Sequence, residues 1–327
     1  MRAIHYALFT LVVACGFWAC AQRAQGQSIQ EFDDGDIHVL HVQGNVYLLA
    51  GAGGNITIEA GDQGVVLVDA GSADHAARVL AVIQKVSKRP IRFIIDTAQD
   101  ADRIGGNEIL SSAGITVAGA LNQSNELDAS PGAQLVAHEN VYNRLSGLNG
   151  GKRTAPPGTL PLDIYPGGIK KLFVNEGIAI IHIPSAHTDG DSIVHFRGSD
   201  VVSAGEIFNT TSYPIIDLAN GGSVQGIING LNRILEIAIP KQEEEGGTYV
   251  IPGHGRIGDQ FDVLEYRDMV TIVRDRIQAL IKKGVSLQQI KAARPTEEYD
   301  DLYGSRSGSW TTDMFVEAVY KSLVGKK

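Results

Sequence analysis

The sequence predicts an α/β fold in which two β-sheets pack against each other and helices cover their outer sides. Three observations predict it. Short apolar runs rich in β-branched residues are broken by glycines, segments with helical spacing follow these runs, and this β-then-α order occurs twice along the chain. Because each sheet has an apolar face that must be buried, two such halves in one chain favour two packed sheets.

The first half contains four short apolar runs that are typical of strands. They are Val46–Leu49, Ile56–Glu59, Val65–Val68 and Ile91–Ile95. Apolar residues then recur at helical spacing. The helices expected in this half are Ala73–Val86, Asn107–Ser112 and Gln134–Leu145, and a short strand is expected at Ile115–Val117.

Residues Gly147–Gly168 are rich in glycine and proline and predict a surface loop that overhangs a site. The strand pattern restarts after this loop. The expected strands are Lys171–Val174, Ile178–Ile183, Ser192–Phe196, Val201–Ala204 and Tyr249–Ile251. The expected helices are Val224–Ile237, Val263–Lys283, Ser286–Ala293 with Ser286 as the N-cap, and Thr311–Leu323.

The composition gives no sign of a nucleic-acid footprint, and the partner expected for this chain is a small-molecule substrate. The 327-residue chain has a formal net charge of -9, with no long basic or acidic block. The only cysteines are Cys15 and Cys20, near the N-terminus. The body of the chain therefore has neither a cysteine nucleophile nor a cysteine ligand for zinc.

The N-terminus predicts a signal peptide over residues 1–26, with export to the periplasm or the medium. Arg2 precedes a mostly apolar run, and Ala24–Gly26 suits cleavage before Gln27. Alternatively, Val12–Cys15 resembles a lipobox, and Cys15 would anchor an outer-membrane lipoprotein. The apolar run is shorter than the roughly 20 residues of a membrane-spanning helix, so no span is expected in the mature protein. Residues 27–327 then form one domain with a helical extension from about residue 259, either as a monomer or as a homodimer.

Five short motifs, each just after an expected strand, carry the chemistry of this chain. They are Val68–Gly71 (V-D-A-G), Thr97–Asn107 (T-A-Q-D-A-D-R-I-G-G-N), Ala186–Ser192 (A-H-T-D-G-D-S), Ala204–Phe208 (A-G-E-I-F) and Ile251–Gly255 (I-P-G-H-G). In order and spacing they resemble the D-x-G, T-H-x-H-x-D-H-x-G-G-N, A-H-T-x-G-x-S, G-D-x-[LF] and P-G-H-G elements of the metallo-β-lactamase superfamily. The resemblance implies an αββα sandwich of two mixed sheets, with a site along one edge of them.

The resemblance also implies a metal site, which in the family is a pair of zinc ions held by histidines and acidic residues. Where the family has three loop histidines, this chain has Ala98, Asp100 and Arg103, and the loop aspartate is retained as Asp102. Alanine offers no ligand atom, and arginine is always charged and has no acceptor. The loop therefore departs from the family pattern at two ligand positions.

The later ligand positions hold two histidines and a glutamate in place of the family's aspartate. The candidate metal ligands are Asp100, Asp102, His187, Glu206 and His254. Three carboxylates and two imidazoles suit one divalent ion, expected to be zinc, with manganese or iron as alternatives. Arg103 then replaces the second ion as a cation among Asp100, Asp102 and Glu206. Alternatively, these carboxylates only pair with Arg103 and no metal binds.

Three further residues are candidates for contact with a substrate. Asn55 follows two glycines in an expected turn, and such a sequence is also common in plain turns. His138 lies on an expected helix that faces the site in the family layout, with a half-buried structural histidine as the alternative. Tyr213 follows the Glu206 turn, and its hydroxyl can donate to an oxyanion, with packing in the core as the alternative.

These residues predict an exported hydrolase of an ester, lactone or amide bond, β-lactams included. A metal-activated water would attack the substrate, with Asp102 and Arg103 as the catalytic residues beside the ion. The alternative is a catalytically inactive binding protein of this fold, in which Arg103 replaces the second metal and favours an anionic ligand. A third alternative is metal-free acid–base chemistry by Asp100 or Glu206.

Overall fold

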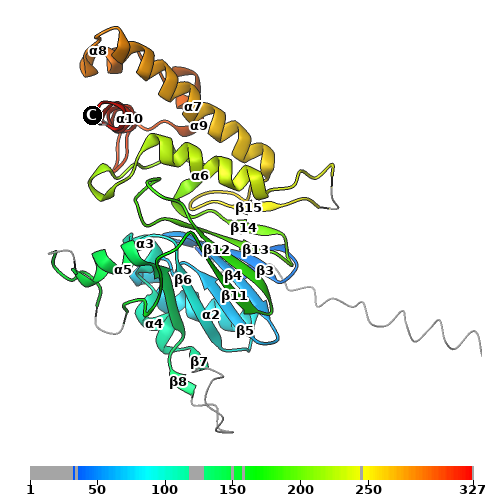
Figure 1. Cartoon of the computed structure of the whole chain (residues 1–327). Helices are drawn as coiled ribbons and strands as arrows, with labels where there is room; N and C mark the ends of the chain where they lie inside the picture. Colours follow the sequence, from blue (N-terminus) through cyan, green and yellow to red (C-terminus); the bar gives the residue numbers. More distant parts are fainter. Residues whose placement is uncertain are drawn as a thin grey trace, which may run out of the picture. The chain divides into compact units, whose positions relative to one another are not determined.

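The computed structural model describes residues 32–33, 36–117, 129–148, 151–156, 159–243 and 246–325 (Figure 1). The expected signal peptide, with Cys15, lies outside these residues. Within the described part of the chain, no helix has the length and apolar character that crossing a membrane requires.

The first sheet is mixed and carries its antiparallel strands before its parallel ones. Strands β1 to β5 follow one another antiparallel, whereas β5, β6, β9 and β10 are parallel neighbours in that order. The strands are β1 (Phe32–Asp33), β2 (His38–Gln43), β3 (Val46–Ala52), β4 (Gly54–Gly61), β5 (Gly64–Val68), β6 (Ile91–Asp96), β9 (Gln134–His138) and β10 (Asp163–Tyr165).

The second sheet is also mixed. Strands β11 to β14 are antiparallel neighbours, and β15 joins β14 in parallel. The strands are β11 (Ile169–Val174), β12 (Glu176–His182), β13 (Ser192–Phe196), β14 (Val201–Ser203) and β15 (Tyr249–Ile251). A separate two-stranded ladder joins β7 (Ile115–Val117) to β8 (Ala129–Pro131).

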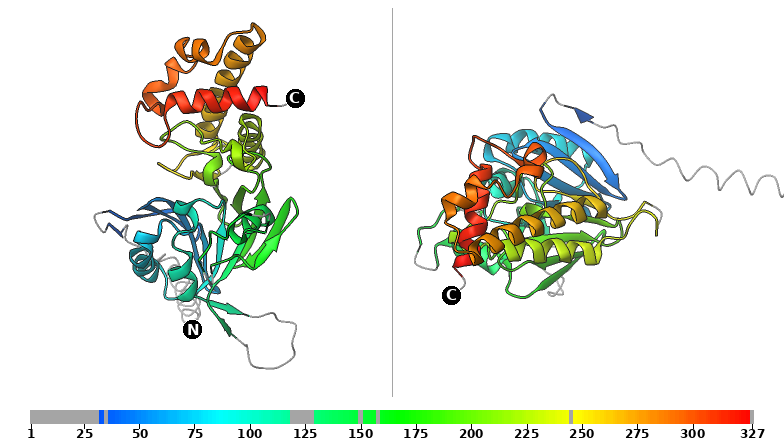
Figure 2. Two further views of the ribbon diagram at one scale, coloured as in Figure 1. Left: turned by 90° about the vertical axis from the view of Figure 1, so that its left-hand side faces the viewer. Right: turned by 90° about the horizontal axis from the view of Figure 1, so that it is seen from above.

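The two sheets bury one apolar face against each other and the other face beneath helices. Side chains of both sheets share one buried cluster, to which the first sheet contributes Val66 and the second Phe196. Helices α2 (Ala76–Val86) and α4 (Asn107–Ser112) pack on the outer face of the first sheet. Helices α6 (Val224–Ile237) and α7 (Gln260–Lys282) cover the second, and α10 (Thr312–Val324) packs against these two helices on the side away from the sheet (Figures 1 and 2). The αββα sandwich is therefore confirmed.

Short helices connect these layers and carry several of the residues discussed below. They are η1 (Ala73–His75), α3 (Ala101–Ile104), α5 (Glu139–Ser146), η2 (Gly205–Ile207), η3 (Leu218–Asn220), α8 (Leu287–Ala292), η4 (Glu297–Tyr299) and α9 (Asp300–Tyr303). Ser286 caps α8 as expected, and its hydroxyl accepts from the backbone N–H of Gln289.

The expected helix Gln134–Leu145 is wrong in its first part. Residues Gln134–His138 form β9, which pairs in parallel with β6 and β10, and the helix α5 begins only at Glu139. A strand with neighbours on both sides and buried faces shows no alternation of polar and apolar residues, so its pattern resembles that of a helix. The loop expected at Gly147–Gly168 likewise contains the short strand β10.

Candidate metal centre

The candidate site lies where strands of both sheets end. Asp69 follows β5, the Asp100–Arg103 segment follows β6, Glu206 lies in the turn after β14, and His254 lies in the loop after β15. Because β5 and β6 are parallel, as are β14 and β15, their carboxyl ends meet at the same edge of each sheet. The fold thus brings together residues that are far apart in the sequence.

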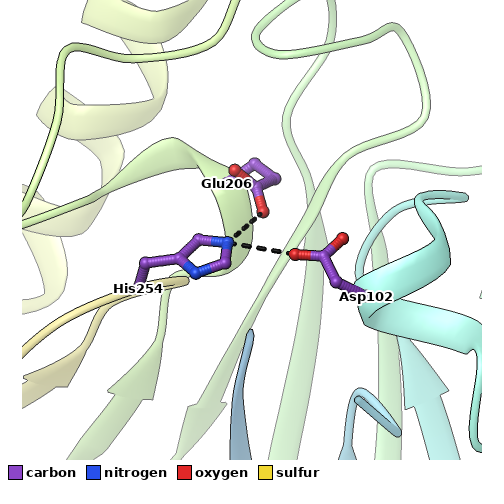
Figure 3. Close-up of side chains that lie close together, drawn as sticks. All are labelled: Asp102, Glu206 and His254. Carbon is purple, nitrogen blue, oxygen red and sulfur yellow. Dashed lines mark ion pairs between the residues drawn. The ribbon is translucent and has the colours of Figure 1, made fainter. Parts of the chain in front are cut away.

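Asp102, Glu206 and His254 form the centre of the site. Each offers a ligand atom, and these atoms all lie within 4.8 Å of one another. His254 Nε2 is 3.0 Å from Asp102 Oδ2 and 3.6 Å from Glu206 Oε1. Figure 3 shows Asp102, at the start of α3, facing the two residues that come from the second sheet.

The two carboxylates keep His254 protonated in the absence of a metal ion. Hydrogen bonds to Asp102 and Glu206 raise the pKa of His254 to about 9, although partial burial opposes this. Burial alone would raise the pKa of Asp102, but His254 and Arg103 outweigh it and lower that pKa. For Glu206, burial is likewise outweighed by Arg103 and the histidines, and its pKa falls well below the usual range.

Arg103 is completely buried, and its guanidinium is surrounded by acceptors. Nε donates to Glu206 Oε1 at 2.8 Å, Nη2 donates to the same oxygen, and both Nη atoms donate to the Gly253 carbonyl oxygen at 3.1 Å. Nη1 lies 3.6 Å from Asp69 Oδ2, and Nη2 lies 3.5 Å from Asp102 Oδ2. Burial lowers the pKa of an arginine, but these three carboxylates outweigh it and raise that of Arg103. Its partners are thus Asp69, Asp102 and Glu206, and not Asp100 as the sequence had suggested.

Two glycines leave the space that the guanidinium fills. A Cβ atom on Gly54 would lie 2.6 Å from Arg103 Nη1, and one on Gly253 would lie 2.9 Å from Nη2. A Cβ atom essentially never lies this close to another heavy atom, so a side chain at Gly54 would displace the guanidinium, and one at Gly253 would also meet the Gly205 carbonyl oxygen at 2.6 Å. Glycine at these two positions is therefore needed for the guanidinium to lie where it does.

Asp69 is a residue of this site that the sequence reasoning did not include among the functional side chains. It has a positive φ of 63°, which aspartate tolerates better than most residues. Its carboxylate accepts from the backbone N–H of Thr97 at 2.8 Å and from the Thr97 hydroxyl. Burial raises its pKa to about 6 although Arg103 opposes this, so Asp69 is ionised at neutral pH. The V-D-A-G motif at Val68–Gly71 could have identified Asp69 from the sequence, because it places this aspartate at a strand end.

Asp100 and His187 form a second pair beside the three central residues. His187 Nε2 lies 3.1 Å from Asp100 Oδ2, and its Nδ1 lies 3.0 Å from the Ile215 carbonyl oxygen. Burial lowers the pKa of a histidine, but Asp100 and the nearby Asp191 and Glu206 carboxylates raise that of His187 to about 10. Of the five expected ligands, the structure therefore gathers three and pairs the other two.

The three candidates for substrate contact lie in different surroundings. Asn55 is buried against the loop of His254, and its side chain donates to the carbonyls of Pro252 and Gly255. His138 is also buried, at the end of β9, and its ring stacks on that of His182 with a centroid distance of 3.6 Å. This placement corrects the expectation that His138 lies within a helix.

Tyr213 lies apart from the central residues. Its hydroxyl donates to the Thr296 carbonyl at 3.2 Å and to Asp300 Oδ1 at 2.9 Å, and its ring stacks on Phe315. The side chain is buried among the C-terminal helices. The structure thus gives Tyr213 the packing role that was the alternative to an oxyanion donor.

Comparison with known proteins assigns the family. The sequence profile described as Metallo-beta-lactamase superfamily matches residues 41–254, which is more than half of the chain. The protein belongs to the metallo-beta-lactamase superfamily. Most members of this superfamily are metal-dependent hydrolases.

Solved structures with this fold include enzymes of two kinds. A double mutant of the sec-alkylsulfatase PisA1 is 17% identical with a TM-score of 0.65, and the match covers 88% of this chain and 50% of that one. The stereoselective inverting sec-alkylsulfatase Pisa1 from Pseudomonas sp. is 16% identical (TM-score 0.61; 88% and 50%). A metallo-beta-lactamase from Hirschia baltica is 15% identical (TM-score 0.51; 72% and 97%). The chain spans half the length of the sulfatases, and the likeness at these identities concerns the fold.

The three central residues fit one divalent ion. Metal–ligand distances of about 2.0–2.2 Å place neighbouring ligand atoms roughly 3.3 Å apart, and the two separations from His254 Nε2 are 3.0 and 3.6 Å. Asp69, Asp102 and Glu206 supply three negative charges, of which Arg103 balances one. The remaining two match a divalent ion bound together with a neutral His254. The Asp100–His187 pair offers two donors, one fewer than the three protein ligands of catalytic zinc sites.

Proposed function

We propose that this protein is a hydrolase that binds one divalent metal ion, zinc in the first instance, through Asp102, Glu206 and His254. The observation that carries the proposal is the convergence of these three ligand atoms within 4.8 Å of one another. Arg103 takes the place of a second ion, since its guanidinium supplies positive charge to Glu206 and Asp102. Manganese and iron suit the same oxygen-rich ligands.

In this proposal the ion supplies Lewis acidity and a water activated near neutral pH. The protein supplies the positions. Asp102 is the carboxylate that can orient the attacking water or accept its proton, because its side chain is 31% exposed to solvent. Arg103 holds Glu206 in one orientation and itself contacts no solvent. Asp100 and His187, which the sequence made candidate metal ligands, are proposed here as an adjoining acid–base pair, because His187 Nε2 lies 3.1 Å from Asp100 Oδ2; ligation of the ion is the alternative.

The substrate proposed is a small molecule with an ester, lactone or amide bond, β-lactams included. The sulfatases and the β-lactamase that share the fold add a sulfate ester and a β-lactam to the substrates worth testing. The proposal also places the protein in the periplasm or outside the cell, because of the signal peptide expected over residues 1–26.

Metal titration tests the central claim. Protein purified without chelator is titrated with Zn²⁺, Mn²⁺ and Fe²⁺, and bound metal is measured by mass spectrometry after desalting. About one equivalent is expected for the wild type and for the control Tyr213→Phe, with loss of binding in Asp102→Asn and His254→Gln. Less than about 0.2 equivalents of every metal in the wild type would overturn the proposal.

The same titration distinguishes the second candidate, a catalytically inactive binding protein. The observation in its favour is that Glu206 Oε1 already accepts two hydrogen bonds from Arg103, so Arg103 alone can satisfy this carboxylate. Hydrolysis of a lactone, a β-lactam or an alkyl sulfate that disappears in both His254→Gln and Asp102→Asn would exclude it. Absence of both metal and hydrolysis would favour it.

A further inference from the structure

The loop that carries His254 is held by a side chain from the opposite sheet. Asn55, at the start of β4 in the first sheet, donates through Nδ2 to the Pro252 carbonyl at 3.0 Å and to the Gly255 carbonyl at 2.9 Å. Its backbone N–H donates to the Gly253 carbonyl at 2.9 Å. Asn55 therefore binds three carbonyl groups on both sides of His254.

Arg103 binds the same loop at the same carbonyl. Both of its Nη atoms donate to the Gly253 oxygen at 3.1 Å, beside the bond from the Asn55 backbone. The loop also has backbone bonds within its own half of the fold, from Gly253 N–H to Phe208 and from Thr210 N–H to the His254 carbonyl. The backbone around His254 is thus fixed from both sheets.

Among the described residues, two acidic groups form ion pairs with the His254 side chain. It is 30% exposed, and its ion pairs are those with Asp102 and Glu206. The position of Nε2 therefore depends on the backbone of residues 252–255. A ligand placed in advance by a rigid backbone binds a metal more tightly than one that must be ordered on binding.

We propose that Asn55 is a positioning residue for His254. With Arg103, it fixes the backbone of residues 252–255 and so places His254 Nε2 opposite Asp102 and Glu206. Asn55 then acts on the loop and not on the substrate, although sequence alone made it a candidate for substrate contact. The part of this inference that concerns metal affinity rests on the proposed function.

The matched variants are Asn55→Ala and Thr57→Val. Asn55→Ala removes both side-chain bonds to the loop and keeps the backbone bond to Gly253. Thr57 is also on β4, and its hydroxyl donates to Ser203 Oγ in the second sheet at 3.0 Å. Thr57→Val therefore removes a buried bond between the sheets without touching the His254 loop. If Asn55→Ala does not fold, Asn55→Ser replaces it.

Two measurements on these variants test the inference. The first is hydrogen exchange in the metal-free protein at the amides of Gly253 and Thr210, which donate to the Phe208 and His254 carbonyls. We expect exchange to become at least about tenfold faster in Asn55→Ala and to stay at the wild-type rate in Thr57→Val. The second is the Kd for Zn²⁺ by competition with a chromophoric chelator, which should weaken about 10- to 100-fold in Asn55→Ala and stay unchanged in Thr57→Val.

The outcomes separate this inference from the proposed function. Exchange at the Gly253 and Thr210 amides that is unchanged in Asn55→Ala, or that rises equally in both variants, would overturn the positioning role. A Kd within about twofold of the wild type would overturn its effect on metal binding. If the wild type binds no zinc at all, the proposed function fails, and the exchange comparison still decides whether Asn55 fixes the loop.

Discussion

Replacing Arg103 by methionine removes the buried cation and leaves its acidic partners in place. Methionine fills part of the volume of the arginine stem but offers no donor. The change would strip Glu206 Oε1 of two hydrogen bonds and the Gly253 carbonyl of two more. It would also leave the carboxylate of Asp69, which is 2% exposed, without a positive partner, and that of Glu206, which is 5% exposed, with His254 alone.

The expected loss is large because the charges left behind are buried. Removing one partner of a buried ion pair typically destabilises a protein by about 3–5 kcal/mol, since the remaining charge has lost both its counter-ion and its water. Two acidic groups depend on Arg103 here, so we expect a loss of about 4 kcal/mol in the free energy of unfolding at pH 7.5. The double variant Arg103→Met/Glu206→Gln should recover about 2 kcal/mol of it, because the amide carries no charge.

The loss should depend on pH. In the wild type the pKa of Glu206 lies below its unfolded value near 4.5, so the stabilisation by its charge is complete above that pH and declines only at lower pH. Without Arg103, burial raises the pKa of Glu206, and the folded variant takes up a proton as the pH falls from neutral. The free energy of unfolding of the variant therefore rises as the pH falls from 7.5 to 5, and its difference from that of the wild type becomes smaller.

Urea-induced unfolding, followed by far-UV circular dichroism with a chelator present, measures these free energies. The chelator removes any contribution from bound metal, which would itself stabilise the folded state. A loss below about 1 kcal/mol at pH 7.5 would refute this reasoning. An equal loss at pH 7.5 and pH 5, or a double variant no more stable than the single one, would also refute it.

Three further predictions concern other groups. Burial raises the pKa of Glu59 from 4.5 to about 7, so between these pH values the folded state holds a proton that the unfolded state releases. The free energy of unfolding should therefore fall by about 3 kcal/mol as the pH rises from 4.5 to 7. Urea titrations of Glu59→Gln should not show this dependence on pH. Tyr213→Phe removes the bond to Asp300 and should lower the free energy of unfolding by about 1–2 kcal/mol with an unchanged Kd for zinc, whereas weaker zinc binding would contradict its packing role. A metal must displace the proton of His254, whose pKa is about 9, so zinc affinity measured calorimetrically should rise about tenfold per pH unit between pH 6 and 8; a flat profile would argue against this ligand.

Most strands could be predicted because their sequences are short β-branched runs between glycines. Gly64–Val68 and Ser192–Phe196 are of this kind. Strand β9 could not, because Gln134–His138 has partners on both sides and continues directly into α5. Its identity as a strand depends on β6 and β10, which are distant in sequence, and local periodicity contains no information about them.

The motifs identify residues that the structure brings close together, but the partner of each side chain could not be predicted from them. Each motif fixes a position at a strand end, whereas the partner of each side chain depends on how the two sheets meet. The third carboxylate at Arg103 is Asp69 and not Asp100, because Asp100 turns to His187. Tyr213 donates to Asp300 and not to a group of the site. Asp300 is distant in the sequence, and no local sequence pattern connects the two residues.

Gly54 and Gly253 restrict the order in which this site can change in evolution. A single substitution from glycine to any larger residue at either position places a Cβ atom within 3 Å of the guanidinium and is incompatible with arginine at position 103. A single return from Arg103 to the histidine of the family pattern leaves the buried Glu206 and Asp69 carboxylates without the guanidinium that they share. A return toward a site for two ions thus begins with a destabilised intermediate. The arginine, once accepted, is entrenched by the buried carboxylates that it neutralises.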